Sequence, residues 1–222
     1  MSISINDLIF LSEGYCYSCK NEIYTKKYFC NNCLNLFEYV NGIKYFGEHR
    51  CYYPYLYTGK IKELIGSFKF YNHSYLYRAF GEILVAYIKE IDLDFDCIIP
   101  TPISKRKLSK RGYNQTELLA DYIGEKLKVE ILKDAVVKKK NTKDQHLLSI
   151  EKRATNLKDS FKLIDKNLGD KKILILDDIV TSGYTLKEIA KVFEENGNRN
   201  IEALVIASSK IESKFKVGFK NV

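Results

Sequence analysis

The stretch from Ile173 to Thr185 restricts the fold more than any other part of the chain. Its four consecutive apolar residues, Ile173 to Leu176, are typical of a strand that is covered on both faces, as in a parallel sheet. Asp177 and Asp178 follow, and a small hydroxyl-rich loop then leads into apolar residues at helical spacing. In open α/β sheets, ligands bind at the carboxyl ends of such strands. We therefore expect an α/β fold whose ligand site lies at this loop.

The loop itself has the chemistry of a phosphate site. The hydroxyls of Thr181, Ser182 and Thr185 can join the backbone N–H groups at the start of the helix in holding a phosphate. Gly183 lets the backbone approach that phosphate closely. The two adjacent carboxylates cannot favour the same phosphate, but they suit ribose hydroxyls, directly or through a magnesium ion shared with phosphates. The expected ligand is a phosphorylated sugar.

Two cysteine pairs near the start of the chain have the spacing of a structural zinc site. Each pair has the form Cys-x-x-Cys, and ten residues separate the pairs. Four thiolates can close a tetrahedral site, which leaves no open position for catalysis; unrelated free cysteines or a redox pair are the alternatives. The expected ligands are Cys16, Cys19, Cys30 and Cys33. Cys51 and His49 stand nearby as further candidates, although a buried apolar side chain is the simpler interpretation of Cys51.

Length and charge set wider limits. The 222 residues suffice for one α/β domain with a small appendage, and the formal charge of +8 fits a phosphate-binding enzyme and a nucleic-acid binder equally. Leu8 to Leu11 is too short for a signal peptide or a membrane span, so we expect a cytoplasmic protein without a transmembrane segment. The aromatic run from Cys51 to Tyr57, with Pro54 inside it, indicates an extended linker. We therefore divide the chain into a zinc-binding module, residues 1–50, and an α/β domain, residues 51–222.

Apolar periodicity outlines the other elements of the larger domain. Helical spacing recurs at Ile61 to Phe68, Tyr77 to Ile88 and Leu118 to Leu127, the last with Asn114 as its N-terminal cap. Short apolar runs predict strands at Phe95 to Ile99, Val129 to Leu132, Ala135 to Val137, Ser160 to Ile164 and Ile201 to Ala207.

A second anion site is expected directly after the strand at residues 95–99. Thr101 lies there between two prolines, which fix the loop so that its backbone amides can be aimed at an anionic group. The basic segment 104–115 comes next and has little apolar periodicity. We expect it to be a mobile loop that closes over a charged ligand, with Arg106 and Lys107 neutralising a leaving group. A solvated basic surface or a nucleic-acid contact is the alternative.

Two single residues allow both a functional and a plain interpretation. Lys69, framed by Phe68 and Phe70, can reach an anionic ligand or simply extend to the surface. His146 has the chemistry of a general base, but no partner carboxylate is evident, which favours an exposed loop histidine.

At residues 173–185 the pattern resembles the PRPP-binding motif of type I phosphoribosyltransferases, where PRPP is phosphoribosyl pyrophosphate. The remaining motifs resemble, in order, those of the ComF family of competence proteins. They are the four-cysteine module, Phe68-Lys69-Phe70, Ile99-Pro100-Thr101-Pro102, Arg111-Gly112-Tyr113-Asn114-Gln115, and Gln145 to Leu148 followed by Arg153 and Asn156. The resemblance covers nearly the whole chain. It implies an α/β, type I phosphoribosyltransferase-like fold, doubly wound with a mainly parallel sheet, and a small zinc-ribbon-like module at its N-terminus.

The resemblance also implies roles for individual residues. Asp177 and Asp178 would meet the ribose hydroxyls of PRPP. Its 5′-phosphate would be held by Thr181, Ser182, Gly183, Tyr184 and Thr185, of which Tyr184 departs from the usual small residue. Thr101 falls where this superfamily keeps its pyrophosphate-binding turn, and residues 104–115 where it keeps its flexible loop; Lys69 and Arg111 complete the expected PRPP contacts.

The implied reaction is displacement of pyrophosphate from C1 of PRPP by a nitrogen nucleophile. Mg²⁺ bound with PRPP, together with Arg106 and Lys107, would stabilise the departing pyrophosphate, and Asp177 and Asp178 would hold the ribose ring in line. These four residues are the expected participants in catalysis. No residue stands out as an obligatory general base, so the sequence names no acceptor.

The ComF resemblance implies a cytoplasmic role in natural transformation. The protein would handle incoming single-stranded DNA, at the inner face of the membrane through partners, with a helicase-like competence ATPase among them. One alternative is a nucleic-acid-binding module that holds single strands by stacking and charge and keeps a regulatory or vestigial PRPP site. Another is a metabolic base-salvage phosphoribosyltransferase, which is less favoured because that class does not usually carry the zinc module.

Overall fold

A mixed sheet forms the centre of the computed structural model, which describes residues 14–24, 27–71, 73–139, 160–164, 168–211 and 213–214. Its main path runs β11-β1-β2-β9-β7-β3-β4. The pairs from β2 to β4 on this path are all parallel, whereas β1 and β11 add an antiparallel edge next to β2. The main strands are β1 (Tyr39–Phe46), β2 (His49–Leu56), β3 (Cys97–Pro100), β4 (Glu130–Ile131), β7 (Ile173–Leu176), β9 (Ile201–Leu204) and β11 (Ser213–Lys214).

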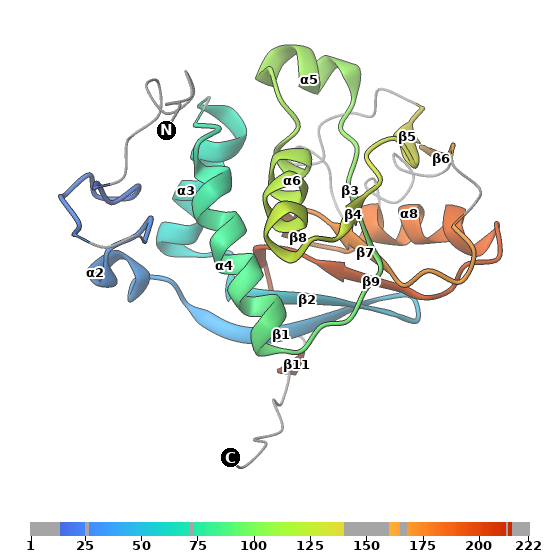
Figure 1. Cartoon of the computed structure of the whole chain (residues 1–222), viewed down its shortest axis with the longest axis horizontal. Coiled ribbons are helices and arrows are strands. Elements are labelled where there is room, and N and C mark those ends of the chain that lie inside the picture. The colour runs from blue at the N-terminus through green and yellow to red at the C-terminus, as the bar shows by residue number, and fades with distance from the viewer. Residues whose placement is uncertain are drawn as a thin grey trace.

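Shorter strands and the helices complete the fold (Figure 1). β8 (Ile179–Val180) and β10 (Ala207–Ser208) pair with each other, and β10 also pairs with β2; β5 (Val136–Lys138) and β6 (Phe161–Leu163) form a separate pair. The helices are α2 (Asn31–Leu34), α3 (Gly59–Phe70), α4 (Leu76–Glu90), α5 (Lys105–Arg111), α6 (Gln115–Leu127) and α8 (Tyr184–Glu194).

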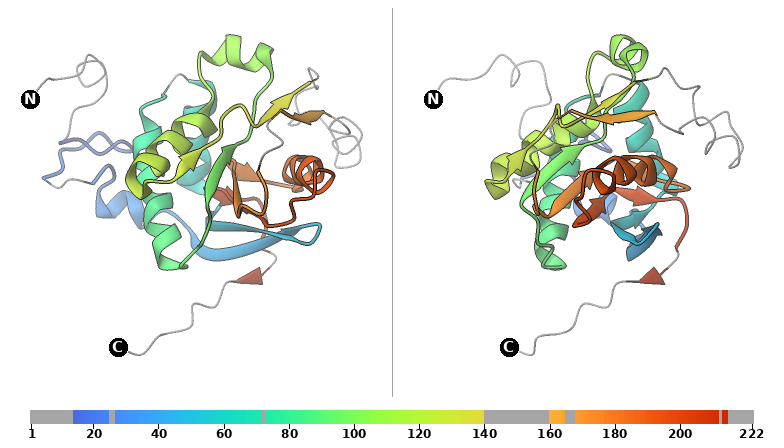
Figure 2. Two further views of the ribbon diagram at one scale, coloured as in Figure 1. Left: turned by 45° about the vertical axis from the view of Figure 1, so that its right-hand side comes forward. Right: turned by 90° about the vertical axis from the view of Figure 1, so that its right-hand side faces the viewer.

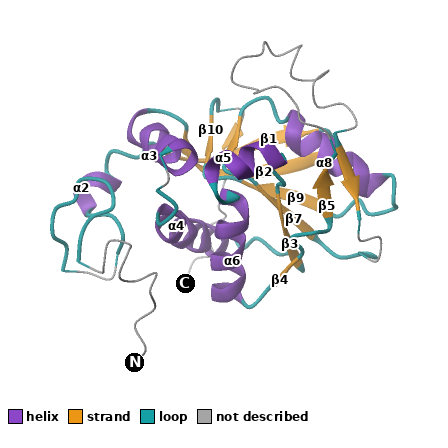
Figure 3. Ribbon diagram, turned by 90° about the horizontal axis from the view of Figure 1, so that it is seen from above, coloured by secondary structure: helices purple, strands orange, loops and turns teal. Residues whose placement is uncertain are grey.

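Helices cover both faces of the sheet, and this explains the continuous apolar run of β7 (Figure 3). Leu174 and Leu176 belong to the core that includes α3, α4 and α6. Ile173 and Ile175 belong to the core on the opposite face, with α8 and the β5–β6 pair. All four are at most 1% exposed, and burying such a side chain contributes about 1.5–3 kcal/mol. The expected parallel, doubly covered strand is confirmed.

Most of the expected elements are confirmed. The three helices predicted before residue 128 are α3, α4 and α6, and the predicted strands correspond to β3, β4, β5, β6 and β9. Asn114 caps α6, since its Oδ1 accepts from the backbone N–H of Thr116 at 3.2 Å.

The linker expected at Cys51 to Tyr57 is wrong, because most of this run belongs to β2, a strand inside the sheet. Its aromatic and apolar residues are dense because both faces are covered: Tyr52 packs in one core, and Tyr53 packs in the other. Pro54 is tolerated because it lies between the β9 and β10 pairings of β2 and opposite an irregularity in β1. The boundary at residue 50 falls within this strand, so residues 39–46 and 49–50 of the expected module lie in strands of the main sheet.

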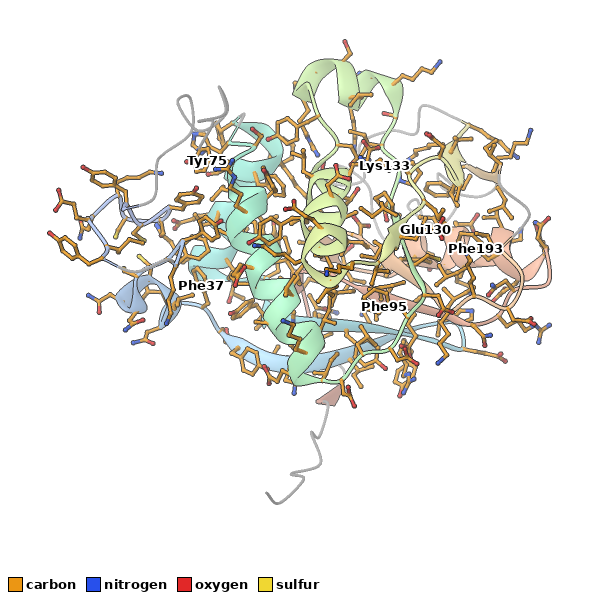
Figure 4. All side chains as sticks on the ribbon, in the orientation of Figure 1. Phe37, Tyr75, Phe95, Glu130, Lys133 and Phe193 are labelled. Carbon is orange, nitrogen blue, oxygen red and sulfur yellow. The ribbon has the colours of Figure 1, made fainter. Side chains whose placement is uncertain are left out.

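The N-terminal module packs against α4 through aromatic side chains. The rings of Tyr17 and Tyr75 meet edge to face at 5.1 Å, and those of Phe29 and Phe80 lie 6.3 Å apart. Lys20 Nζ donates to the Tyr75 hydroxyl at 3.0 Å. Figure 4 labels Tyr75 beside the module. Because Tyr17 and Phe29 are less than a tenth exposed, the module shares its core with the larger domain.

Candidate functional site

The segments expected to bind PRPP line a single cleft. It has a volume of about 970 Å³ and is lined by Asp177, Asp178, residues 181–185, Thr101, Lys69 and part of α5. β7 and β3 are adjacent parallel strands, so the loops that follow them open on the same edge of the sheet. Figure 2 shows α5 standing above this edge.

Asp178 is the most enclosed polar residue of the cleft and has two partners. Its Oδ1 lies 2.8 Å from Lys69 Nζ, and its Oδ2 accepts a hydrogen bond from Gln115 Nε2 at 2.6 Å. Asp178 is 3% exposed and Lys69 is 7% exposed. Burial alone would raise the pKa of Asp178, but Lys69, Gln115 and the charge of Arg111 together hold it below its usual range. Asp178 is therefore a fixed anion.

Asp177 has the opposite character. It lines the cleft and stays partly exposed, and its Oδ1 accepts from the backbone N–H of Asp178 at 2.8 Å. Its place deep in the cleft and the adjacent charge of Asp178 raise its pKa to about 7, against the opposing effect of Lys69. Near neutral pH, Asp177 can accept from a hydroxyl when ionised or donate to one when protonated.

The loop after Asp178 lines the same cleft up to the start of α8. α8 begins at Tyr184, and Gly183 precedes it in the left-handed region with φ of 76°, which favours glycine. Residues 181–185 all line the cleft, so the first N–H groups of an eleven-residue helix open toward it. Tyr184 also packs partly against the α8 core, which accommodates its ring beside the loop.

The turn at Thr101 is built rigidly. Its carbonyl accepts from Asn114 Nδ2 at 3.2 Å and from Thr116 Oγ1 at 2.7 Å, and its N–H donates to the Leu176 carbonyl at 2.9 Å. The Thr101 hydroxyl is buried, lines the cleft and has no hydrogen-bond partner among the described residues. A buried hydroxyl without a partner costs free energy until a ligand or water satisfies it.

The basic segment 104–115 is not the irregular loop that the sequence indicates, because residues 105–111 form helix α5. Ser104 caps this helix by accepting from the Lys107 N–H at 3.3 Å, and Gly112 ends it with φ of 81°. No residue of α5 is buried, so its own caps rather than a core stabilise it. Whether α5 moves over a ligand stays a prediction.

The side chains of α5 point in different directions. Lys107 and Arg111 line the cleft, whereas Arg106 is exposed and is not among the lining residues. The Arg111 guanidinium donates to Gln115 Oε1 and lies 5.7 Å from the centre of the Phe70 ring. Through Gln115, Arg111 at the exposed rim of the cleft is linked to the buried Asp178 at its floor.

The four cysteines of the N-terminal module meet in one cluster. Their sulfurs all lie within 4.8 Å of one another, which suits a single metal ion. Burial would raise the pKa of Cys16, but hydrogen bonds from the backbone N–H groups of residues 19, 30 and 18 lower it to about 6, which favours the thiolate that a metal needs. Cys51 is fully buried within β2, and His49 Nε2 lies 2.7 Å from Glu194 Oε1, so neither joins the cluster.

Comparison with known proteins assigns this architecture. Residues 110–221 match the phosphoribosyl transferase domain family. The chain belongs to this phosphoribosyltransferase family. It is 28% identical over 200 residues to Competence protein F of Haemophilus influenzae, a match that covers 87% of this chain and 84% of that protein. It is 26% identical to Competence protein ComFC of Streptococcus pneumoniae over 86% of this chain and 80% of that protein.

These matches make the chain a ComF-type, phosphoribosyltransferase-like protein. The DNA utilization protein YhgH of Shigella flexneri is 30% identical over 151 residues, which span 66% of each chain. Among solved structures, adenine phosphoribosyltransferase of Giardia lamblia complexed with 9-deazaadenine is 14% identical, with a TM-score of 0.42 over 80% of this chain and 83% of that one. The type I phosphoribosyltransferase fold expected from the sequence is confirmed.

Within this phosphoribosyltransferase fold, the sequence indicates the two loops but not the roles of Gln115 and Lys138 in the cleft. The sequence shows Gln115 only as the last residue of the Arg111-Gly112-Tyr113-Asn114-Gln115 motif. Its contact with Asp178 joins residues 63 positions apart, and no local pattern predicts such a contact. Lys138, on β5, lines the cleft but looked like part of a polar connection. Lys69 does not extend to the surface, so that alternative is wrong. His146, Gln145 to Leu148, Arg153 and Asn156 lie outside the described residues.

Proposed function

We propose that the cleft binds PRPP together with Mg²⁺ and that the chain is a phosphoribosyltransferase-like protein of DNA uptake. The observation that carries this proposal is that two anion-suited turns, at Thr101 and at residues 181–185, line one cleft together with Asp177. A ligand with phosphate groups at both ends of a sugar matches this arrangement.

We place each part of PRPP against the residues of the cleft whose chemistry suits it. The 5′-phosphate lies at residues 181–185, where the positive end of the α8 dipole favours an anion. The ribose hydroxyls lie at Asp177. The pyrophosphate lies at the Thr101 turn, where Lys107 and Arg111 line the cleft and oppose its charge.

The proposed reaction is nucleophilic displacement at C1 of the ribose. A nitrogen lone pair of the acceptor forms the new bond to C1, the bond from C1 to the pyrophosphate oxygen breaks, and its electron pair leaves with pyrophosphate. The attacking nitrogen then releases its proton to solvent. Mg²⁺, when bound, neutralises charge on the pyrophosphate. Lys107 and Arg111 stabilise the same developing charge, and Asp177 holds the ribose.

Calorimetry with Mg²⁺ and PRPP tests this proposal. We expect saturable binding to the wild-type protein and a loss of at least about tenfold in Asp177→Asn. Asp170→Asn, a matched change at an exposed position outside the cleft, should bind like the wild type. No measurable heat with the wild type would overturn the proposal. Pyrophosphate release in the presence of free bases or oligonucleotides then identifies the acceptor.

The role in DNA uptake rests on the relatives, which are named competence or DNA utilization proteins. By this proposal the chain handles incoming single-stranded DNA, with a helicase-like competence ATPase as partner at the inner face of the membrane. Co-purification with that ATPase from transforming cells tests the partnership. Within the described residues, no helix is long and apolar enough to cross a membrane.

A second candidate function is nucleic-acid binding with PRPP as a regulator. It is favoured by α5, where five of the seven residues are basic, none is acidic and none is buried. Single-strand affinity should then fall steeply with salt, and neutralising Arg106 and Lys107 should reduce the logarithmic slope by roughly 1.4, since each single-strand phosphate contact contributes about 0.7. An unchanged slope in the double variant would exclude Arg106 and Lys107 as phosphate contacts.

The cysteine cluster fits zinc as a structural ion. A tetrahedral site with zinc–sulfur bonds of about 2.3 Å requires sulfurs about 3.8 Å apart, and the Cys19 and Cys30 sulfurs are 3.8 Å apart. We propose that zinc, held by all four thiolates, stabilises the module. It would have no open position for catalysis.

A further inference from the structure

Gln115 occupies a place that calls for one donor and one acceptor, which an amide supplies. It is the first residue of α6, and its side chain lies between an acid and a base, donating from Nε2 to Asp178 Oδ2 and accepting at Oε1 from Arg111. A carboxylate only accepts and a guanidinium only donates, so these two partners fix which end of the amide is which. With 5% exposure, water cannot readily replace either contact.

We infer that Gln115 is a positioning residue that fixes Asp178, and through it the Lys69 ammonium, and ties both to Arg111 of α5. This inference rests on the proposed function, because it takes PRPP as the ligand of the cleft. Both oxygens of Asp178 are engaged, one by Lys69 and one by Gln115. Asp178 therefore serves as the anchor of the two cations, and the more exposed Asp177 is the carboxylate that we place against the ribose.

The two cations held in this way lie at different depths. Lys69 lies at the floor beside Asp178, and Arg111 lies at the rim over Phe70. Both line the cleft, so an anionic ligand meets two positive charges that are held in place through Asp178 and Gln115. Preorganised charges of this kind need no rearrangement when the ligand binds.

Three variants separate positioning from packing. Gln115→Met keeps the length of the side chain and removes both hydrogen bonds. Gln115→Glu can still accept from Arg111 but places a negative charge against Asp178. Glu125→Gln, at an exposed position of the same helix, is the matched control. Mg²⁺-PRPP affinity is measured by calorimetry from pH 6 to 9, and stability by denaturant unfolding.

We expect Gln115→Met to lose at least about tenfold in affinity with no change in the pH midpoint of binding. Gln115→Glu should lose more and move that midpoint upward, because neighbouring carboxylates raise one another's pKa. The charged groups near Asp178 and residue 115 are Lys69 from α3, Arg111 from α5, Asp177 next to Asp178 in the chain, and Lys138 from β5. Glu125→Gln should match the wild type.

Wild-type affinity and pH midpoint in both folded Gln115 variants would overturn the inference. Failure of the proposed function is distinguishable, because the wild type itself would then show no PRPP binding. In that case the positioning role of Gln115 is tested without ligand, by recording the NMR signal of the ¹⁵N-labelled side-chain ammonium of Lys69. Gln115→Met should shift or broaden it, and an unchanged signal would equally overturn the inference.

Discussion

Lys69 Nζ lies 2.8 Å from Asp178 Oδ1, and both residues are less than a tenth exposed. The pair joins the end of α3 to the loop after β7 at the floor of the cleft. Removing one partner leaves an uncompensated buried charge, which is far more costly than breaking an exposed ion pair.

Lys69→Met should therefore lower the free energy of unfolding by about 3–5 kcal/mol. The matched control is Lys171→Met, which breaks the exposed pair with Glu130 (labelled in Figure 4) and should cost less than about 1 kcal/mol. Urea unfolding at pH 7 measures both. Adding Asp178→Asn to Lys69→Met should cost much less than the sum of the single changes, and additive losses would count against a coupled pair.

Asp177 should give the protein a distinct pH dependence. Its pKa in the folded protein is about 7, above the ordinary value of 3.8, so the folded state retains a proton that the unfolded chain loses. The stability that this carboxyl contributes is fully present below about pH 4 and is lost as the pH rises through 7. Asp177→Asn should thus be more stable than the wild type at pH 8, by about 1–3 kcal/mol because the group is partly exposed, with little difference at pH 4.

Unfolding curves for the two proteins at pH 4, 6 and 8 measure this difference. A stability gap that is the same at all three pH values would show that Asp177 does not titrate as described.

The parts of the fold that were predictable are those in which local pattern and tertiary environment agree. The β7 run, the helix after it and the cap at Asn114 depend on neighbours in sequence, and so the sequence indicates them. β2 was missed because Pro54 normally marks an edge or a linker, and only the pairing of β9 and β10 explains its place.

The site shows the same division. The loops that line the cleft have recognisable sequence motifs, so the sequence predicts them. The contacts of Asp178 with Lys69 and Gln115 join three segments that are distant in sequence, so no local motif predicts them. From side-chain chemistry alone, both Asp177 and Asp178 are expected to contact the ribose. Geometry assigns one of them to the protein's own cations.

Gly183 should tolerate no side chain without a cost. Its φ of 76° lies where an added Cβ is strained, while the nearest atom to that Cβ, Phe46 Cβ, is at an ordinary 3.5 Å. Gly183→Ala should therefore lose about 1 kcal/mol of stability from the backbone alone. Gly66→Ala, inside α3 with nothing within 4 Å of the new Cβ, should instead gain about 0.5–1 kcal/mol. Thermal unfolding compares them, and equal shifts of the same sign would contradict the argument.

Metal removal should affect the N-terminal module first and then the core it shares. Because a stretch of this size cannot build a full core alone, we expect its folding to depend both on a bound metal and on the core that it shares with α4. Metal analysis should find one zinc per chain in the wild type and none in Cys16→Ser, while Cys51→Ser, buried in β2, should keep its zinc. Chelation should expose Tyr17 and Phe29 from their contacts with α4 and lower the unfolding temperature of the whole chain. A purified protein without stoichiometric zinc, or one whose unfolding is unaffected by chelator, would refute a structural zinc site.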